Sequence, residues 1–143
     1  MAKRSMSMTI SSDFAEGKKA MHRIMTAVAA AKFNHANMHA IKLALDEAVN
    51  NAIKHGNRLD PEKKVRIQAK VDPKQTEIII EDEGVGFIRE RVPDPRLDEN
   101  LEKCSGRGIF LIESYMDQVE WTQGGRRLRM VKLNNAAKPN HSP

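Results

Sequence analysis

The order of secondary-structure elements is the feature of this sequence that most constrains its fold. Hydrophobic spacing, caps and turn residues predict a strand, two helices, two strands, a polar loop, a short helix and two last strands. The predicted elements are a strand at 5–10, a helix from an N-cap at Ser11 or Ser12 to about Lys32, a helix to about His55 that ends at Gly56-Asn57, strands at 64–72 and 76–82, a loop at 88–105, a helix that begins at 106–108, and strands at 117–122 and 126–133. This order predicts an α+β sandwich in which helices cover one face of a mostly antiparallel mixed sheet.

The length and composition of the chain fit one cytoplasmic domain. Its 143 residues can bury a hydrophobic core without metal or disulfide staples, so we expect a single domain over 1–143. We expect its core at about 8–133 and a flexible tail at 134–143. Cys104 is the only cysteine, so no internal disulfide can form, which favours a reducing compartment. No apolar run reaches the ~18 residues of a membrane span, and we expect no membrane contact.

The positive charge of the chain is concentrated near its C-terminus. The formal net charge is +5, but five basic residues and no acidic residue follow Gln123, which leaves 19 basic and 19 acidic residues over 1–123. A basic excess in one terminal strand and tail is more typical of a solubilised edge strand than of a surface that reads DNA. The chain also has only one Trp, one Tyr and four Phe to stack on bases. Nucleic-acid binding is therefore not expected.

The second predicted helix carries a polar face that helix stability does not explain. Glu47, Asn51 and Lys54 fall within about 60° of one another at 100° per residue, with His55 at the margin. Asn is a poor helix former because its amide competes for backbone groups, so Asn51 suggests a functional requirement. The opposite side of the helix forms an apolar stripe of Met38, Ile41, Leu45, Ala48, Val49 and Ala52.

Two glycine-containing segments carry further chemistry. In "IIIEDEGVGF" an apolar strand ends at Asp82, whose carboxylate can accept a hydrogen bond from an exocyclic amine such as that of adenine. Gly84 and Gly86 allow the backbone to turn and approach a ligand closely. In "SGRGIFLIE" Gly106 and Gly108 open a helix, where free N–H groups and the helix dipole can meet a phosphate. Each segment alone is a weak signal.

The three segments together resemble the Bergerat-fold ATP-binding superfamily, which includes histidine-kinase catalytic domains, gyrase, Hsp90 and mismatch-repair ATPases. The resemblance covers roughly residues 8–133. Glu47, Asn51, Lys54 and His55 resemble the N-box of that superfamily. Asp82-x-Gly84-x-Gly86 and Gly106-x-Gly108 resemble its two glycine boxes, which makes 88–105 the ATP lid. The wording "EAVNNAIKHGN" and "GRGIFLIESYMDQVEW" is most similar to the anti-sigma-factor serine kinases of bacterial partner-switching pathways.

The resemblance implies a role for each matched residue. Asn51 is expected to bind Mg²⁺ through its amide oxygen, and Glu47 to act as the general base near the γ-phosphate. Lys54 or His55 is expected to contact phosphate or the lid, although His55 can equally cap the last carbonyls of its helix. The implied ATP-binding residues are Asn51, Lys54, His55, Asp82, Gly84, Gly86, Lys103, Ser105, Gly106, Arg107 and Gly108.

One position departs from the family pattern. The anti-sigma-factor kinases are expected to carry a basic residue before the Ser-Gly of the second glycine box, where this chain has Cys104. Lys103 or Arg107 is then left to contact the γ-phosphate. The thiol is either a redox group or an incidental residue.

The sequence therefore predicts an ATP- and Mg²⁺-dependent serine/threonine protein kinase that is also an anti-sigma factor. By resemblance, it phosphorylates a small STAS-type anti-sigma-factor antagonist and sequesters a sigma factor, with a homodimer as a further possibility. A nucleotide-binding module that sequesters its partner without phosphotransfer is the main alternative. A histidine-kinase catalytic domain is a weaker one, because His22 is the only candidate phosphoacceptor in a periodic segment and no antiparallel helix precedes the N-box.

Overall fold

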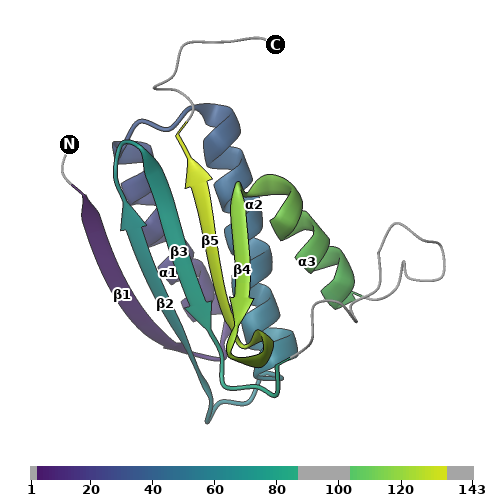
Figure 1. Cartoon of the computed structure of the whole chain (residues 1–143). Coiled ribbons are helices and arrows are strands. Elements are labelled where there is room, and N and C mark those ends of the chain that lie inside the picture. Colours follow the sequence, from purple (N-terminus) through teal and green to yellow (C-terminus); the bar gives the residue numbers. More distant parts are fainter. Residues whose placement is uncertain (1–2, 87–103, 135–143) are drawn as a thin grey trace.

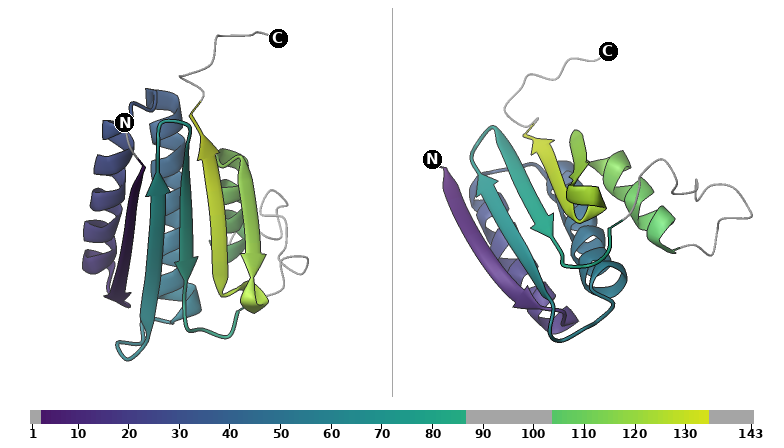
Figure 2. Two further views of the ribbon diagram at one scale, coloured as in Figure 1. Left: turned by 60° about the vertical axis from the view of Figure 1, so that its left-hand side comes forward. Right: turned by 60° about the horizontal axis from the view of Figure 1, so that its bottom comes forward.

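The described part of the chain is a two-layer sandwich of three α-helices on one face of a five-stranded sheet (Figure 1). The computed structural model describes residues 3–86 and 104–134. Figure 2 shows the helices gathered on one side of the sheet and the other side left open. This arrangement confirms the α+β sandwich predicted from the order of the elements. Within the described residues, no helix is both long enough and apolar enough to cross a membrane.

The sheet has the strand order β1-β2-β3-β5-β4. Every neighbouring pair of these strands is antiparallel. We predicted a mostly antiparallel mixed sheet, but the described sheet has no parallel pair. The last two strands close the sheet as a hairpin in which β5, not β4, lies against β3. The strands are β1 (Arg4–Ser11), β2 (Lys64–Val71), β3 (Gln75–Glu81), β4 (Gln118–Thr122) and β5 (Arg127–Leu133).

One face of the sheet and the inner sides of the helices form the hydrophobic core. Burial alternates residue by residue along β2, as it does in a strand with one covered face. The cross-strand pair Ile67 and Ile80 joins β2 to β3 on the covered face. The largest fully buried side chains include Ile24, Ile41, Leu45, Ile53, Ile67, Ile78, Ile112 and Met130.

Helix α1 (Phe14–Ala30) begins later than we predicted. Its N-cap is Asp13, whose carboxylate accepts a hydrogen bond from the N–H of Ala15 at 2.9 Å. The predicted caps Ser11 and Ser12 were wrong. Ser12 is instead buried, and its hydroxyl donates to the carbonyl of Lys63 at 2.9 Å. Ser12, which the local sequence suggested as a helix cap, therefore makes a tertiary hydrogen bond instead.

Helix α2 (His35–Asn50) continues into a π-helix, η1 (Asn51–Gly56). The sequence predicted one regular α-helix to His55, so the change of helix type is a correction. The N–H of Asn57 donates to the carbonyl of Ala52, five residues earlier, at 2.8 Å. Such π-bulges widen the turn and occur frequently at functional sites. Here the wider turn begins at Asn51, in the middle of the predicted N-box.

Helix α3 (Cys104–Tyr115) begins two residues before the predicted start. The second glycine segment therefore lies inside the first turns of the helix and not ahead of it. Helix α3 packs against α2 and buries Ile109 and Ile112 as predicted, whereas Phe110 is only partly covered. The predicted loop at 88–105 otherwise lies outside the described residues. A short 3₁₀ turn, η4 (Gln123–Gly125), joins β4 to β5.

Candidate functional site

The N-box and the first glycine segment meet around one cavity of about 230 Å³. Asn51, His55 and Gly56 reach it from η1, and Asp82 and Gly86 from the segment after β3. The turn between β4 and β5 closes another side, and Ile109 of α3 adds an apolar wall. The described residues that line it are Ala48, Asn51, Ala52, His55, Gly56, Arg58, Ile80, Asp82, Val85, Gly86, Ile109, Gly125, Arg126 and Leu128. A mainly apolar cavity with a few convergent polar groups is typical of a small-molecule site.

Asp82 is the acidic group of this cavity. It follows the end of β3 directly, and its backbone N–H donates to the carbonyl of Arg126 at 3.0 Å. One carboxylate oxygen, Oδ1, accepts a hydrogen bond from the N–H of Gly84 at 2.8 Å. Burial raises the pKa of Asp82, while the Gly84 hydrogen bond and the charge of Arg126 oppose that shift. Among the described residues no hydrogen bond reaches Oδ2, so we regard this oxygen as the acceptor available to a ligand.

Close backbone contacts hold the first glycine segment against the end of η1. A Cβ on Gly56 would lie 2.5 Å from the carboxylate carbon of Asp82. A Cβ on Gly84 would overlap the carbonyl oxygen of Gly56. Gly86 has φ +79°, a left-handed conformation that favours glycine, and a Cβ there would overlap the carbonyl oxygen of Gly124. The predicted need for glycine at 84 and 86 therefore has a structural cause in backbone-to-backbone packing.

The polar face of the N-box lines a second hollow of about 250 Å³ on the outer side of α2 and η1. Glu47, Asn51, Lys54 and His55 all reach this hollow, which confirms that the predicted polar face brings them together. Asn51 and His55 line both hollows and so connect them. Asn50 and the half-exposed Phe14 at the start of α1 complete its lining.

Gly108 brings α3 against this polar face. A Cβ at Gly108 would lie 2.9 Å from Oε2 of Glu47 and 3.0 Å from Nδ2 of Asn51. Only a glycine therefore allows the helix to approach both side chains without displacing them. Burial raises the pKa of Glu47, and the neighbouring charge of Asp46 raises it further. A carboxylate with a raised pKa is a stronger proton acceptor, as a general base requires.

The remaining predicted residues are placed less completely. The side chains of Lys54 and His55 make no hydrogen bond among the described residues, so the alternative role of His55 as a helix cap finds no support. Burial lowers the pKa of His55, and the charge of Lys54 lowers it further. Arg107 is exposed in the first turns of α3. Ser105 and Gly106 belong to α3, but their side-chain environment, like Lys103 itself, lies outside what the structure describes.

Several lining residues were not predicted from the sequence. Ile80 and Leu128 form the sheet wall of the cavity, and Arg58 and Val85 lie at it as well. Arg126 follows the glycines that separate the last two strands, so the Gly124-Gly125 pair was an available signal. The sequence predicts Asn57 only as a helix terminator, whereas in the structure its side chain is fully buried beside the site.

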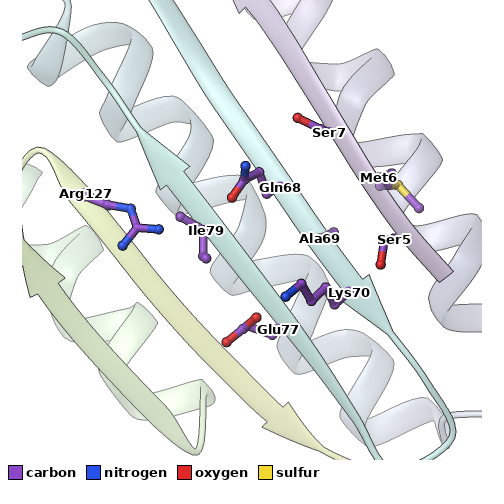
Figure 3. Close-up of a pocket in the computed structure, with 9 residues that line it drawn as sticks. All are labelled: Ser5, Met6, Ser7, Gln68, Ala69, Lys70, Glu77, Ile79 and Arg127. Carbon is purple, nitrogen blue, oxygen red and sulfur yellow. The ribbon is translucent and has the colours of Figure 1, made fainter. Parts of the chain in front are cut away.

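A larger hollow of the described molecule lies elsewhere. It measures about 470 Å³ and crosses the open face of the sheet, where side chains such as Gln68, Lys70 and Glu77 project from β2 and β3 (Figure 3). Among the described residues, none of those predicted to be functional lines it. The motif residues therefore identify the site better than cavity size does.

Helices on one face of an antiparallel sheet, with an N-box and a glycine box around one cavity, define an ATPase-type domain. The family model of the histidine kinase-like ATPase domain matches residues 10–132, and the chain belongs to that family. The predicted resemblance to this superfamily is confirmed.

Individual relatives of the chain include anti-sigma F factors and a serine-protein kinase. The chain is 43% identical over 83 residues to an anti-sigma F factor of Oceanobacillus iheyensis, a match that covers 56% of each chain. It is 38% identical over 82 residues to an anti-sigma F factor of Clostridium perfringens, with 56% of this chain and 59% of that protein covered. The matched segments thus span little more than half the length of these relatives. The serine-protein kinase RsbW of Bacillus subtilis is 27% identical over 118 residues, which cover 76% of this chain and 72% of RsbW.

A solved structure supports the fold. The RsbU and RsbW domains of a Mycobacterium tuberculosis protein match with a TM-score of 0.58 at 13% identity. The match covers 92% of this chain and 31% of that one. At this identity the likeness supports the architecture of the sandwich alone.

Proposed function

We propose that this protein is an ATP- and Mg²⁺-dependent serine/threonine protein kinase that also acts as an anti-sigma factor. The observation that supports this proposal most is the contact of Gly108 with both Glu47 and Asn51. Gly108 belongs to the second glycine segment, the Glu47 carboxylate is suited to accept a proton, and the Asn51 amide is suited to bind a metal. All three lie close together. The similarity to anti-sigma F factors and to RsbW points in the same direction.

The cavity beside Asp82 is proposed to bind the adenine base. Oδ1 already accepts a hydrogen bond from Gly84, so Oδ2 is free to accept one from the exocyclic amine. Ile80, Ile109 and Leu128 offer apolar surface to the faces of the ring. A carboxylate acceptor selects a base that presents an amine over one that presents a carbonyl.

Asn51 is proposed to bind Mg²⁺. Its amide lies between the two hollows, and the carboxylate of Glu47 lies close to the same Gly108 position. Within the described residues there is no group of three or more His, Cys, Asp or Glu that could hold a metal by itself. A single amide ligand suits Mg²⁺, because this ion retains most of its waters and binds through few protein groups together with phosphate. The ion supplies charge neutralisation between the phosphates.

Glu47 is proposed to be the general base. In the transfer step, the substrate Ser or Thr hydroxyl gives its proton to the Glu47 carboxylate while its oxygen bonds the γ-phosphorus. The bond from that phosphorus to the bridging oxygen breaks, and ADP leaves with the electron pair. Lys54 and Arg107 are cations on the two elements that meet at this point, and they are proposed to contact the phosphates.

The proposed protein substrate is a small STAS-type anti-sigma-factor antagonist, and the sequestered partner is a sigma factor. The sigma-factor proposal rests on the similarity to anti-sigma F factors and on the family resemblance, whereas the STAS-type substrate and a homodimer rest on the resemblance alone. The test incubates the chain with γ-labelled ATP, Mg²⁺ and each small STAS-type protein encoded near its gene. Transfer of label to a Ser or Thr of one of them is expected.

The main alternative is a binding module that holds nucleotide and partner without phosphotransfer. If the wild-type chain binds ATP and a partner but labels none of the candidates, the kinase proposal fails and this alternative replaces it. If it binds no ATP at all, both are wrong.

A further inference from the structure

Asn57 is a buried amide that joins four parts of the chain beside the candidate site. It follows η1 directly and is fully buried. Its Nδ2 donates to Oγ of Ser12 at 3.0 Å and to the carbonyl of Lys64 at 2.9 Å. Its Oδ1 accepts from the N–H of Glu83 at 2.8 Å. The amide therefore uses both donor hydrogens and its acceptor oxygen, and it ties the end of η1 to the turn between β1 and α1, to β2 and to the segment after β3.

The Glu83 hydrogen bond reaches the middle of the first glycine segment. Glu83 lies between Asp82, which is proposed to accept a hydrogen bond from the adenine amine, and Gly84, whose N–H donates to Oδ1 of Asp82. The side chain of Glu83 in turn accepts from the N–H of Lys64 at 2.7 Å. Asn57 and Lys64 together hold Glu83 by its main chain and its side chain.

Asn57 also directly follows Gly56, the residue of η1 that packs against Asp82. Gly56 lies so close to Asp82 that a Cβ there would be 2.5 Å from the carboxylate carbon. The same η1 segment carries Asn51, the proposed metal ligand. One buried amide therefore fixes the distance between the part of the site that carries Asn51 and the part that carries Asp82.

We propose that Asn57 is a positioning residue for nucleotide recognition, which holds the Asp82 carboxylate at the η1 end of the cavity. This proposal rests on the proposed ATP binding. Asn57 is not itself a ligand, because its side chain is fully buried and its amide groups are already used. It acts by setting where Oδ2 of Asp82 meets the base.

The test compares the affinities of ATP and of inosine triphosphate, which carries an oxygen in place of the exocyclic amine of adenine. Calorimetry with Mg²⁺ measures both nucleotides on the wild-type chain and on Asn57→Ala. We expect the wild type to prefer ATP and Asn57→Ala to lose about tenfold or more of that preference, since a displaced acceptor no longer discriminates the amine. General destabilisation alone would weaken both nucleotides equally and leave their ratio unchanged.

Asn134→Ala is the matched control. Asn134 is also a buried amide, and its Nδ2 donates to the carbonyl of Pro73 at 2.9 Å, at the opposite end of the β2–β3 hairpin. We expect this variant to lose stability in urea denaturation but to retain the ATP preference. Circular dichroism checks that each variant is folded. Asn57→Ser keeps a hydroxyl for the cluster but falls short of the Oδ1 position, so it carries the test if Asn57→Ala is unfolded.

The outcomes separate this inference from the proposed function. An unchanged ATP preference in a folded Asn57 variant, or an equal loss in Asn134→Ala, overturns the positioning role but leaves ATP binding intact. Unfolding of both Asn57 variants also overturns it, because the amide is then a requirement of the fold alone. If the wild-type chain shows no preference for ATP over inosine triphosphate, or if that preference does not depend on Asp82, the proposed adenine site is itself wrong.

Discussion

Glu47 combines a raised pKa with a position against α3. Burial raises the pKa of its carboxyl, and Oε2 would lie 2.9 Å from a Cβ at Gly108. We expect Glu47→Gln to bind ATP with Mg²⁺ nearly as the wild type does, because Asp82 and Asn51 are unchanged. Phosphotransfer should fall about 10²- to 10⁴-fold, as is typical when a general base is removed. Initial rates of label transfer to the STAS-type substrate measure this loss.

Asp46→Asn provides a neighbouring control for that experiment. Asp46 is exposed and accepts a hydrogen bond from Asn50, and it does not line the hollow. Its replacement should change the transfer rate much less than Glu47→Gln does. A Glu47→Gln variant that transfers phosphate at the wild-type rate would show that Glu47 is not the base.

Asp82 allows a second prediction at the residue scale. In Asp82→Asn the amide oxygen can keep the hydrogen bond from Gly84, which turns the NH₂ group toward the cavity. That donor faces the adenine amine, so the substitution should cost about 2–4 kcal/mol, or about 30- to 1,000-fold in ATP affinity. Calorimetric titration with ATP measures the change, and an unaltered affinity would rule out this base site.

At the scale of elements, the approach of α3 to α2 depends on the absence of a side chain at Gly108. Gly→Ala inside a helix ordinarily stabilises it by about 1 kcal/mol. Here the added methyl would press on Glu47 and Asn51, whose side chains can move aside. We therefore expect Gly108→Ala to stay folded but to lose about 10- to 100-fold in transfer rate, since small misplacements of catalytic groups are costly.

Ser114→Ala controls for helix propensity in that measurement. Ser114 is exposed on α3, and its hydroxyl donates to the carbonyl of Phe110 within the helix. It should leave the transfer rate close to that of the wild type. Full activity in Gly108→Ala would contradict the proposed contact between α3 and the catalytic face.

At the scale of the whole molecule, Asp82 links stability to pH. Its folded pKa is raised above the ordinary 3.8, mainly by burial, so the folded state favours the protonated carboxyl. The contribution of this group to stability is therefore greatest below 3.8 and is lost as pH rises through the folded pKa. Asn does not titrate, so the unfolding free energy of Asp82→Asn minus that of the wild type should increase from about pH 4 to pH 7.

Urea denaturation of the nucleotide-free proteins across this pH range measures that difference. Only the change with pH is used, because it cancels the other effects of the substitution. A difference that decreases as pH rises would contradict the raised pKa. If the difference does increase, the site keeps an acidic group for its ligand at the expense of stability.

The sequence by itself determined most of the elements and the candidate residues of the proposed site. The runs that predicted β2 and β3 are local patterns, and they gave these strands to within one residue of their bounds. Apolar spacing predicted α2 as well, but the α-helix ends five residues before the predicted end, where η1 begins. Glu47 and Asn51 are four residues apart on one helix, so their shared face followed from helical geometry. Asp82 and the two glycine segments are weak signals taken singly, and the family resemblance joined them to one nucleotide site.

Only the tertiary structure decided how these parts meet. Ser12 does not cap α1 as predicted; its hydroxyl accepts a hydrogen bond from Asn57, 45 residues away in the chain. The side chain of Asn57 also accepts one from the N–H of Glu83, 26 residues away. The placement of β5 against β3 and the position of Arg126 at the cavity likewise depend on distant segments. Local propensity reports only interactions between near neighbours in the chain, whereas buried polar groups take whichever partners the packed fold brings to them.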